Sequence, residues 1–368
     1  MNHIDQLKYQ IALSLIPGVG PSLARQLLTV FGSIEPIFTS RKQALMKVPG
    51  IGEITAQKIV ESDVLERAAE EVEFIQENRI QYASIWDEHY PARLKRCVDA
   101  PLLLFWKGNI SFNASKVVAI VGTRNATNYG RDFCDSLVLE MAQRGGYTVI
   151  SGLAYGIDIA AHKASLKHGV PTIGVLGHGL DQVYPRLHKS VADKMLEYGG
   201  LVSDFISETK IDRQNFLQRN RIIAGLADAT IIVESAEKGG ALVTADIADS
   251  YNRDVFAVPG RHADLFSRGC NLLIKSNKAS MIETLDDLEY AMAWQQEVDK
   301  PTRIQKQLFV ELTDQEQQVV DAMERQPLYI DQLCQRLGMP VGKVSSVLLA
   351  LEFKGIVSSL PGKMYKLT

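Results

Sequence analysis

The sequence predicts an α/β protein: a doubly wound, Rossmann-like parallel sheet, preceded by an all-α helix-hairpin-helix (SAM-like) domain and followed by a winged-helix domain. Three observations predict this architecture. A glycine hairpin is repeated near the N-terminus, short β-branched runs alternate with helical stretches from residue 116 onward, and three helical segments with a hairpin-like tail come last. We expect domains at residues 1–79, 80–294 and 313–368, with a linker at 295–312.

The composition is that of a globular protein. Of 368 residues, 46% are hydrophobic and 23% charged, which excludes a disordered or collagenous chain and fits two or three compact units. The net charge of -3 gives no overall attraction to polyanions, so a nucleic-acid site has to be a local patch. Four scattered cysteines, no secretory signal and no membrane-length apolar run predict a cytoplasmic protein without structural zinc.

The repeated hairpin is the first predicted element. Residues 16–24 (IPGVGPSLA) return at residues 48–56 as VPGIGEITA. The two glycines of each copy permit a tight turn between helices, and the amides that begin the second helix can bind a phosphate. Residues 1–60 carry six Lys or Arg against three acids. The hairpins therefore fit either contact with a DNA backbone or a packing module for protein interactions.

The central domain is predicted as alternating strands and helices. Residues 61–79 form an acidic helix, and residues 80–108 extend the domain that follows. Six strands are expected at 117–121, 148–150, 172–176, 201–203, 230–233 and 255–258, and helices near 129–144, 157–168, 187–198, 216–226 and 242–252. This alternation is typical of one doubly wound parallel sheet.

Polar residues and glycines follow every predicted strand. They are 122–124 (GTR), 151–152 (SG), 177–179 (GHG), 203–204 (SD), 234–235 (ES) and 259–260 (PG). Ligands of open parallel sheets bind at the carboxyl ends of the strands, where glycine lets them approach the main chain. No G-x-G-x-x-G or P-loop sequence is present, which disfavours NAD binding and ATP hydrolysis. The sequence therefore predicts another anion site.

Arginines and aromatic residues near this edge suggest which anion it binds. Arg124, Arg219 and Arg221 can hold phosphates, and Tyr155 and Phe216 are either faces for an unpaired base or core residues. Two pairs, Asp158 with His162 and His178 with Asp181, fit acid–base catalysis or buried structural roles. No nucleophile elbow or carboxylate cluster accompanies them, and no cofactor is expected.

The last predicted unit is a winged helix. Helices are expected from Thr313, over 329–337 and over 341–354, with a turn at 338–340 and a tail at 356–367 that turns at Pro361-Gly362. Its charges balance, and the third helix offers only Lys343 and Lys354 as cations. Helices that read a DNA groove present more donors, so protein contact is favoured.

Five motifs resemble the family of the DNA-processing protein DprA, also called Smf. They are 119–124 (AIVGTR), 151–158 (SGLAYGID) with Ala161-His162, 177–181 (GHGLD) with Tyr184-Pro185, 219–225 (RNRIIAG) and 255–260 (VFAVPG). The motifs follow the family's order and lie between its two usual flanking modules. The resemblance implies a non-catalytic homodimer that binds incoming single-stranded DNA during natural transformation, shields it and helps to load the recombinase RecA.

The resemblance also assigns DNA contacts. It carries Thr123, Arg124, Arg219, Asn220 and Arg221 over as the family's phosphate-binding residues. With the strand ends, the candidate contacts are Gly122, Thr123, Arg124, Ser151, Gly152, Arg219, Asn220, Arg221, Gly239 and Gly240. The loop at 238–242 (KGGAL) departs from the family's Ser-Gly. An alternative is a phosphoribohydrolase of the lysine-decarboxylase-like type, which Glu234, Gly239-Gly240 and Thr244 faintly resemble, without that class's full glycine loop.

Overall fold

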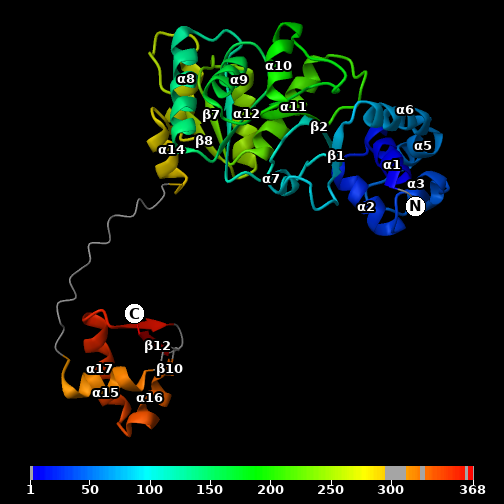
Figure 1. Cartoon of the computed structure of the whole chain (residues 1–368). Coiled ribbons are helices and arrows are strands. Elements are labelled where there is room, and N and C mark those ends of the chain that lie inside the picture. Colours follow the sequence, from blue (N-terminus) through cyan, green and yellow to red (C-terminus); the bar gives the residue numbers. More distant parts are fainter. Residues whose placement is uncertain (1–2, 295–311, 324–327, 361–363, 368) are drawn as a thin grey trace. The chain divides into compact units, whose positions relative to one another are not determined.

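The computed structural model of the chain describes residues 3–294, 312–323, 328–360 and 364–367 (Figure 1). They form two compact units, divided between residues 295 and 296. The first holds a helical bundle and a large sheet, and the second a small helical module with its own buried core. No helix among these residues is long and apolar enough to cross a bilayer.

The N-terminal bundle contains both predicted hairpins. Its helices are α1 (His3–Leu15), α2 (Pro21–Phe31), α3 (Glu35–Thr39), α4 (Lys42–Leu45), α5 (Glu53–Glu61) and α6 (Val64–Glu77). The first glycine of each hairpin, Gly18 and Gly50, has a φ of 94° and 84°, in the region that favours glycine. The second glycines, Gly20 and Gly52, cap α2 and α5. The predicted turns are confirmed.

The sheet has nine strands among the described residues. They are β1 (Gln81–Ser84), β2 (Leu103–Gly108), β3 (Lys116–Val121), β4 (Tyr147–Ser151), β5 (Thr172–Val175), β6 (Gly199–Ser203), β7 (Ala229–Ile232), β8 (Asp254–Ala257) and β9 (Ser280–Met281), in the order β1-β2-β6-β5-β4-β3-β7-β8-β9. The six predicted strands are β3 to β8, all parallel. The predicted number was wrong, because β1 and β2 add an antiparallel edge and β9 a parallel one.

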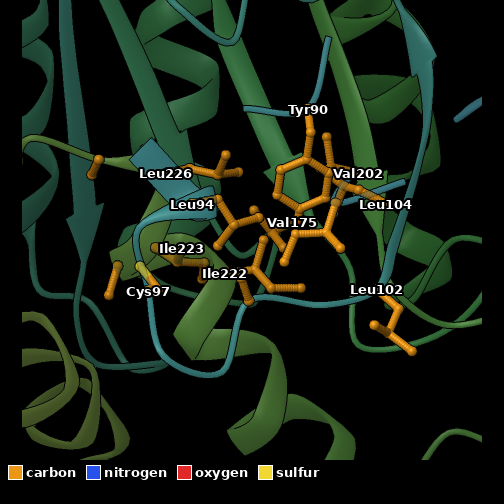
Figure 2. Packing of buried hydrophobic residues seen from close by; sticks show 14 of the residues in the cluster. Tyr90, Leu94, Cys97, Leu102, Leu104, Val175, Val202, Ile222, Ile223 and Leu226 are labelled. Atoms are coloured by element: carbon orange, nitrogen blue, oxygen red, sulfur yellow. The ribbon is translucent and has the colours of Figure 1, made fainter. Parts of the chain in front are cut away.

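Helices cover both faces of the sheet, which is doubly wound as predicted (Figure 1). One face packs on α8 (Asn128–Arg144), α9 (Ile157–His168) and α14 (Leu285–Ala291), and the other on α7 (Ala92–Lys95), α11 (Arg213–Leu226), α12 (Gly240–Ser250) and α13 (Arg268–Lys275). Figure 2 shows the second face, where Ile222 of α11 lies near Val175 of the sheet and Leu226 lies near Leu94 of α7. The helix predicted at 187–198 is shorter: a 3-10 turn (Arg186–His188) leads into α10 (Lys189–Met195).

The helical bundle is joined to the sheet by a shared core. Leu103 and Phe105 of β2 are buried in one cluster with side chains of α1 and α6. On α6, the buried Glu71 carboxylate accepts from the Ser207 amide, and Arg67 donates to the Ser207 carbonyl at 2.7 Å. The predicted boundary at residue 79 therefore falls within one compact unit, and its exact position stays a prediction.

The second unit is the predicted winged helix. Its elements are α15 (Asp314–Ala322), β10 (Leu328–Tyr329), α16 (Ile330–Leu337), α17 (Val341–Phe353), β11 (Val357–Leu360) and β12 (Met364–Leu367), with strands in the order β10-β12-β11. Thr313 and Glu316 form a capping box at the start of α15. The predicted turn at Pro361-Gly362 and nearly all of the linker lie outside the described residues.

Candidate functional site

A cavity of about 490 Å³ lies where the order of the strands reverses. Starting from β3, the chain places β4, β5 and β6 on one side of it and β7 and β8 on the other. The loops after β3 and β7 therefore diverge and leave a crevice at the carboxyl ends, which is where open α/β sheets bind ligands. Three arginines and one carboxylate line this switch-point cavity, namely Arg124, Arg213, Arg219 and Asp158.

The loop after β3 is held rigidly and presents Arg124 to the cavity. The Thr123 amide donates to the carbonyl of Glu234 at 2.7 Å, and the Thr123 carbonyl accepts from the Ile157 amide at 3.1 Å. A Cβ on Gly122 would lie 2.5 Å from Ile157, so only glycine fits. Among the described residues, none forms a hydrogen bond or ion pair with the exposed Arg124 guanidinium. The loop thus offers a free cation on a fixed support.

Helix α11 supplies a second free cation, which the sequence analysis missed. Asp212 caps α11 by accepting from the Gln214 amide at 2.7 Å, so the helix begins at Arg213, one turn before the predicted start. Arg213 is exposed, lines the cavity and has no ion pair among the described residues. It lies seven residues before Asn220, so the two share a helix face. This seven-residue spacing from a predicted contact is the feature of the sequence that could have identified Arg213 as a further contact.

Arg219 forms part of the cavity floor and is nearly inaccessible. Its side chain is buried (3% exposed), and one guanidinium nitrogen donates to the carbonyls of Gly152, at 2.6 Å, and Val175. Burial lowers the pKa of Arg219 to about 10, so it remains charged at neutral pH. Burial also raises the pKa of Asp158, which the Arg219 guanidinium opposes. Arg219 therefore joins the ends of β4 and β5 and contributes positive potential from below.

The N-terminus of α12 completes the cavity wall. Gly239 caps this helix of 11 residues, Gly240 begins it, and both line the cavity. The first amides of a helix lack acceptors within it and attract anions. Nothing lies within 4 Å of a Cβ placed on Gly240, so this side is open to a ligand.

The structure brings together most of the predicted contacts, but not all. Gly122, Thr123, Arg124, Arg219, Asn220, Gly239 and Gly240 line the switch-point cavity. The Ser151 hydroxyl is buried and donates to the carbonyl of Ile120 at 2.6 Å, while Gly152 lines a small neighbouring cavity. Arg221 points into a different cavity of about 250 Å³, where its guanidinium binds the Asp204 carboxylate and the carbonyl of Asp99. The assignment of these residues as DNA contacts stays a prediction.

The candidate catalytic residues have structural partners. His162 Nδ1 lies 2.7 Å from the Thr172 hydroxyl, and His178 Nδ1 donates to the carbonyl of Gly179 at 2.9 Å. Burial lowers the pKa of both histidines, that of His162 to about 3. Among the described residues, no group of three His, Cys, Asp or Glu side chains is placed to hold a metal. These contacts favour the structural interpretation of both pairs.

Fold and site together define a Rossmann-like protein with an arginine-lined cavity at the switch point of its sheet, flanked by two modules common in DNA-binding proteins. Family models identify it further. Residues 81–293 match the model described as DNA recombination-mediator protein A, residues 306–363 the DprA winged helix domain, and residues 11–62 a SAM-like helix-hairpin-helix tandem. The chain belongs to the DprA (Smf) family, as its motifs suggested, and has a DNA-processing role.

Individual relatives agree with this assignment. Protein Smf of Synechocystis is 31% identical, over 97% of this chain and 98% of its own. DNA processing protein DprA of Bacillus subtilis is 39% identical over 58% of this chain and 71% of its own. The crystal structure of DprA from Streptococcus pneumoniae superimposes with a TM-score of 0.64 and 30% identity, covering 77% of this chain and 95% of that one. DprA from Helicobacter pylori, whose structure was studied for its single-stranded DNA binding mode, gives a TM-score of 0.52 and 28% identity, covering 58% and 96%.

Proposed function

We propose that this protein binds single-stranded DNA in the switch-point cavity and acts as a non-catalytic recombination mediator in the bacterial cytoplasm. In this role it shields DNA taken up in natural transformation and helps to load RecA onto it. A homodimer, with two cavities on one strand, would gain affinity through effective concentration. Family membership supports the role, and the binding mode named for the Helicobacter pylori relative supports the ligand.

The observation that carries the proposal is the pair of unpaired guanidiniums at the cavity. Arg124 and Arg213 come from different elements, are exposed and line the same space as the α12 N-terminus. Arginines without internal partners are available for phosphate oxygens. Sequence-independent binding of a polynucleotide depends on cationic contacts to its phosphates, which these two arginines can supply.

The phosphoribohydrolase alternative would need Glu234 to be available for chemistry. The Glu234 carboxylate instead accepts from the Thr127 amide at 2.9 Å and from the Thr127 hydroxyl at 2.5 Å, at the start of α8. It is 3% exposed. Its two oxygens are thus engaged in holding a helix end, which supports the non-catalytic proposal. Release of free base from AMP by the protein would contradict it.

The test is a titration of a labelled oligothymidylate with the full chain, followed by fluorescence anisotropy. We expect Arg124→Ala and Arg213→Ala each to weaken binding about tenfold at moderate salt, the cost of one charge-assisted contact. Each should also reduce the salt dependence by about 0.7 in log Kd per log salt, as one phosphate contact is lost.

Lys278→Ala is the matched control. Lys278 is an exposed cation that pairs with Asp246 at 2.9 Å. It comes just before β9, the last strand in the order of the sheet, and does not line the switch-point cavity. Its loss should leave the affinity within twofold of the parent. If the two arginine variants bind the oligonucleotide as tightly as the parent and the control, the cavity is not the DNA site.

A further inference from the structure

Residues 122–127 form the loop that carries Arg124, and one acidic residue, Glu234, contacts this loop at two anchors. At the start of the loop, the Thr123 amide donates to the Glu234 carbonyl at 2.7 Å. At its end, the Glu234 carboxylate accepts from the Thr127 amide at 2.9 Å and from the Thr127 hydroxyl at 2.5 Å. Arg124 lies between these two anchors, so the position of its backbone depends on Glu234.

The first anchor, at Thr123, extends the pairing of the sheet into the loop. Strands β3 and β7 are hydrogen-bonded neighbours, and the Val233 amide continues their pairing by donating to the Val121 carbonyl at 3.1 Å. The bond from Thr123 to Glu234 comes next. A Cβ on Gly122 would lie 2.9 Å from the Glu234 carbonyl oxygen, so the two chains are in close contact here. The start of the loop is therefore held by the sheet.

The second anchor, at Thr127, is a carboxylate at the N-terminus of α8. Thr127 caps this helix of 17 residues, but its hydroxyl donates to Glu234 instead of accepting from a helix amide. A carboxylate in this position is stabilised by the helix dipole. It is also closely packed, because a Cβ on Gly130 would lie 2.4 Å from Glu234 Oε2. Since Glu234 is 3% exposed, water has little access to compete for these hydrogen bonds.

We propose that Glu234 is a positioning residue for DNA binding: it holds both ends of the loop 122–127 and thereby fixes Arg124 at the switch-point cavity. The proposal rests on the proposed function and adds how one of its two arginines is kept in place. Because the exposed Arg124 side chain has no hydrogen-bond or ion-pair partner among the described residues, its position depends on the backbone that carries it. A donor on a fixed backbone loses less entropy on binding a phosphate than one on a mobile loop.

The charge of Glu234 opposes the binding of a polyanion, and two variants separate this effect from positioning. Glu234→Gln removes the charge but keeps the second anchor, because the amide oxygen can accept from the Thr127 amide and the amide nitrogen can donate to the Thr127 hydroxyl. Glu234→Ala removes both the charge and the second anchor. A lower affinity of the alanine variant than of the glutamine variant therefore measures the loss of the anchor.

The experiment titrates a labelled oligothymidylate with the full chain at moderate salt. Glu234→Gln should bind within threefold of the parent, and Glu234→Ala about tenfold more weakly, which approaches the loss expected for Arg124→Ala. Glu289→Ala is the matched control and should bind within twofold of the parent. The Glu289 carboxylate is similarly buried (6% exposed) and accepts from three side chains, but it does not line the switch-point cavity.

A double-mutant cycle separates positioning from a general loss of structure. If Glu234 acts through Arg124, Glu234→Ala should weaken binding less than twofold in the Arg124→Ala background and keep its full effect in the Arg213→Ala background. Gly130→Ala displaces the carboxylate without removing it, so it should show the same pattern, and it serves as the test if Glu234→Ala does not fold.

A further measurement reports on the loop without DNA. Amide hydrogen exchange in residues 122–131 should be faster in Glu234→Ala than in Glu234→Gln and the parent, because the Thr127 amide loses its acceptor. Exchange in the same residues should be unchanged in Glu289→Ala.

The outcomes distinguish the positioning role from the proposed function. Equal weakening by Glu234→Ala in all three backgrounds, or an alanine variant that binds as tightly as the glutamine variant, would overturn the positioning role and leave DNA binding at the cavity intact. A parent that does not bind the oligonucleotide, or Arg124→Ala and Arg213→Ala variants that bind it as tightly as the parent, would overturn the proposed function instead.

Discussion

Arg124 and Arg219 line the same cavity but have different physical roles. Arg124 is exposed and has no hydrogen-bond or ion-pair partner among the described residues, whereas Arg219 donates hydrogen bonds to two backbone carbonyls. The sequence motifs do not distinguish these cases. Arg124 follows β3 and Arg219 lies on α11, and both are placed at the carboxyl edge of the sheet. Only the packing around Gly152, which leaves room for the Arg219 guanidinium, shows which arginine is built into the floor.

Gly152→Ala tests this role of Arg219. An added Cβ would lie 2.4 Å from Arg219 Nη1 and 2.6 Å from Asp158 Oδ2, so the buried pair has to move. We expect the free energy of unfolding to fall by about 1–3 kcal/mol, as for other overpacked sites, measured by denaturant titration. Gly240→Ala, where the added group meets nothing within 4 Å, is the control and should change stability by less than about 1 kcal/mol. Equal stability of both variants and the parent would mean that the floor is loosely packed.

His162 predicts a pH dependence of stability. Burial, with Arg219 and His188 nearby, lowers its pKa in the folded protein to about 3, against about 6.5 when unfolded. The unfolded state therefore binds the proton first, and stability is lost as the pH falls below about 6.5. Between pH 7.5 and 5 this amounts to about 2 kcal/mol. His162→Leu should remove that part of the decline in denaturant titrations, while His262→Leu, at an exposed position, should not. Parallel declines in all three proteins would contradict the assignment.

Helix α11 explains why the predicted contacts separate. Successive residues turn by about 100° on a helix, so Arg219 and Arg221 point in directions about 200° apart. Arg219 accordingly faces the sheet and the switch-point cavity, and Arg221 faces Asp204 and Asp99. The sequence could predict the helix from its apolar pattern. The motif by itself does not show in which direction each side chain points, and this is why both arginines were predicted for one site although they line different cavities.

Some strands of the sheet could be predicted from the sequence and others could not. The central strands β3 to β8 are buried on both faces and read as β-branched runs between polar ends. Strand β9 has two exposed residues, and β1 and β2 lie among aromatics and prolines without a regular period. Edge strands form because neighbouring backbone groups need partners, a requirement that leaves little trace in the side chains.

The flanking modules carry fewer free cations than the sequence suggests. In the second hairpin, Lys42 pairs with Glu53 at the first residue of α5, at 2.9 Å, which places a carboxylate at that helix start. In the winged helix, Lys354 pairs with Glu316, and α17 exposes Phe353 (85%) and Leu349 (54%). Apolar residues on the third helix agree with the expectation that this module contacts protein.

The two compact units have separate cores, and this determines how the chain should unfold. Residues of the winged helix bury their apolar side chains among themselves, in a cluster around Leu333, Val344 and Leu348. The helical bundle, by contrast, shares buried clusters with the sheet. Three modules can be recognised in the sequence, but periodicity within a helix does not say whether its apolar face packs inside its own module or on the next one.

Removing either end of the chain should therefore have unequal effects. Deleting residues 296–368 should leave the Tm of the first unit within about 2 °C, because no core side chain of that unit is lost. Deleting residues 1–79 uncovers Leu103 and Phe105 and removes the Glu71 acceptor of the buried Ser207 amide. Each exposed apolar side chain costs about 1.5–3 kcal/mol, and a lost buried acceptor about 1–3 kcal/mol, so the Tm of the remaining sheet should drop by about 10 °C or more. Calorimetry of the two truncated chains beside the full one gives the answer. An unchanged Tm after loss of residues 1–79 would show that the sheet is stable without the bundle and that the boundary at residue 79 separates two independent domains.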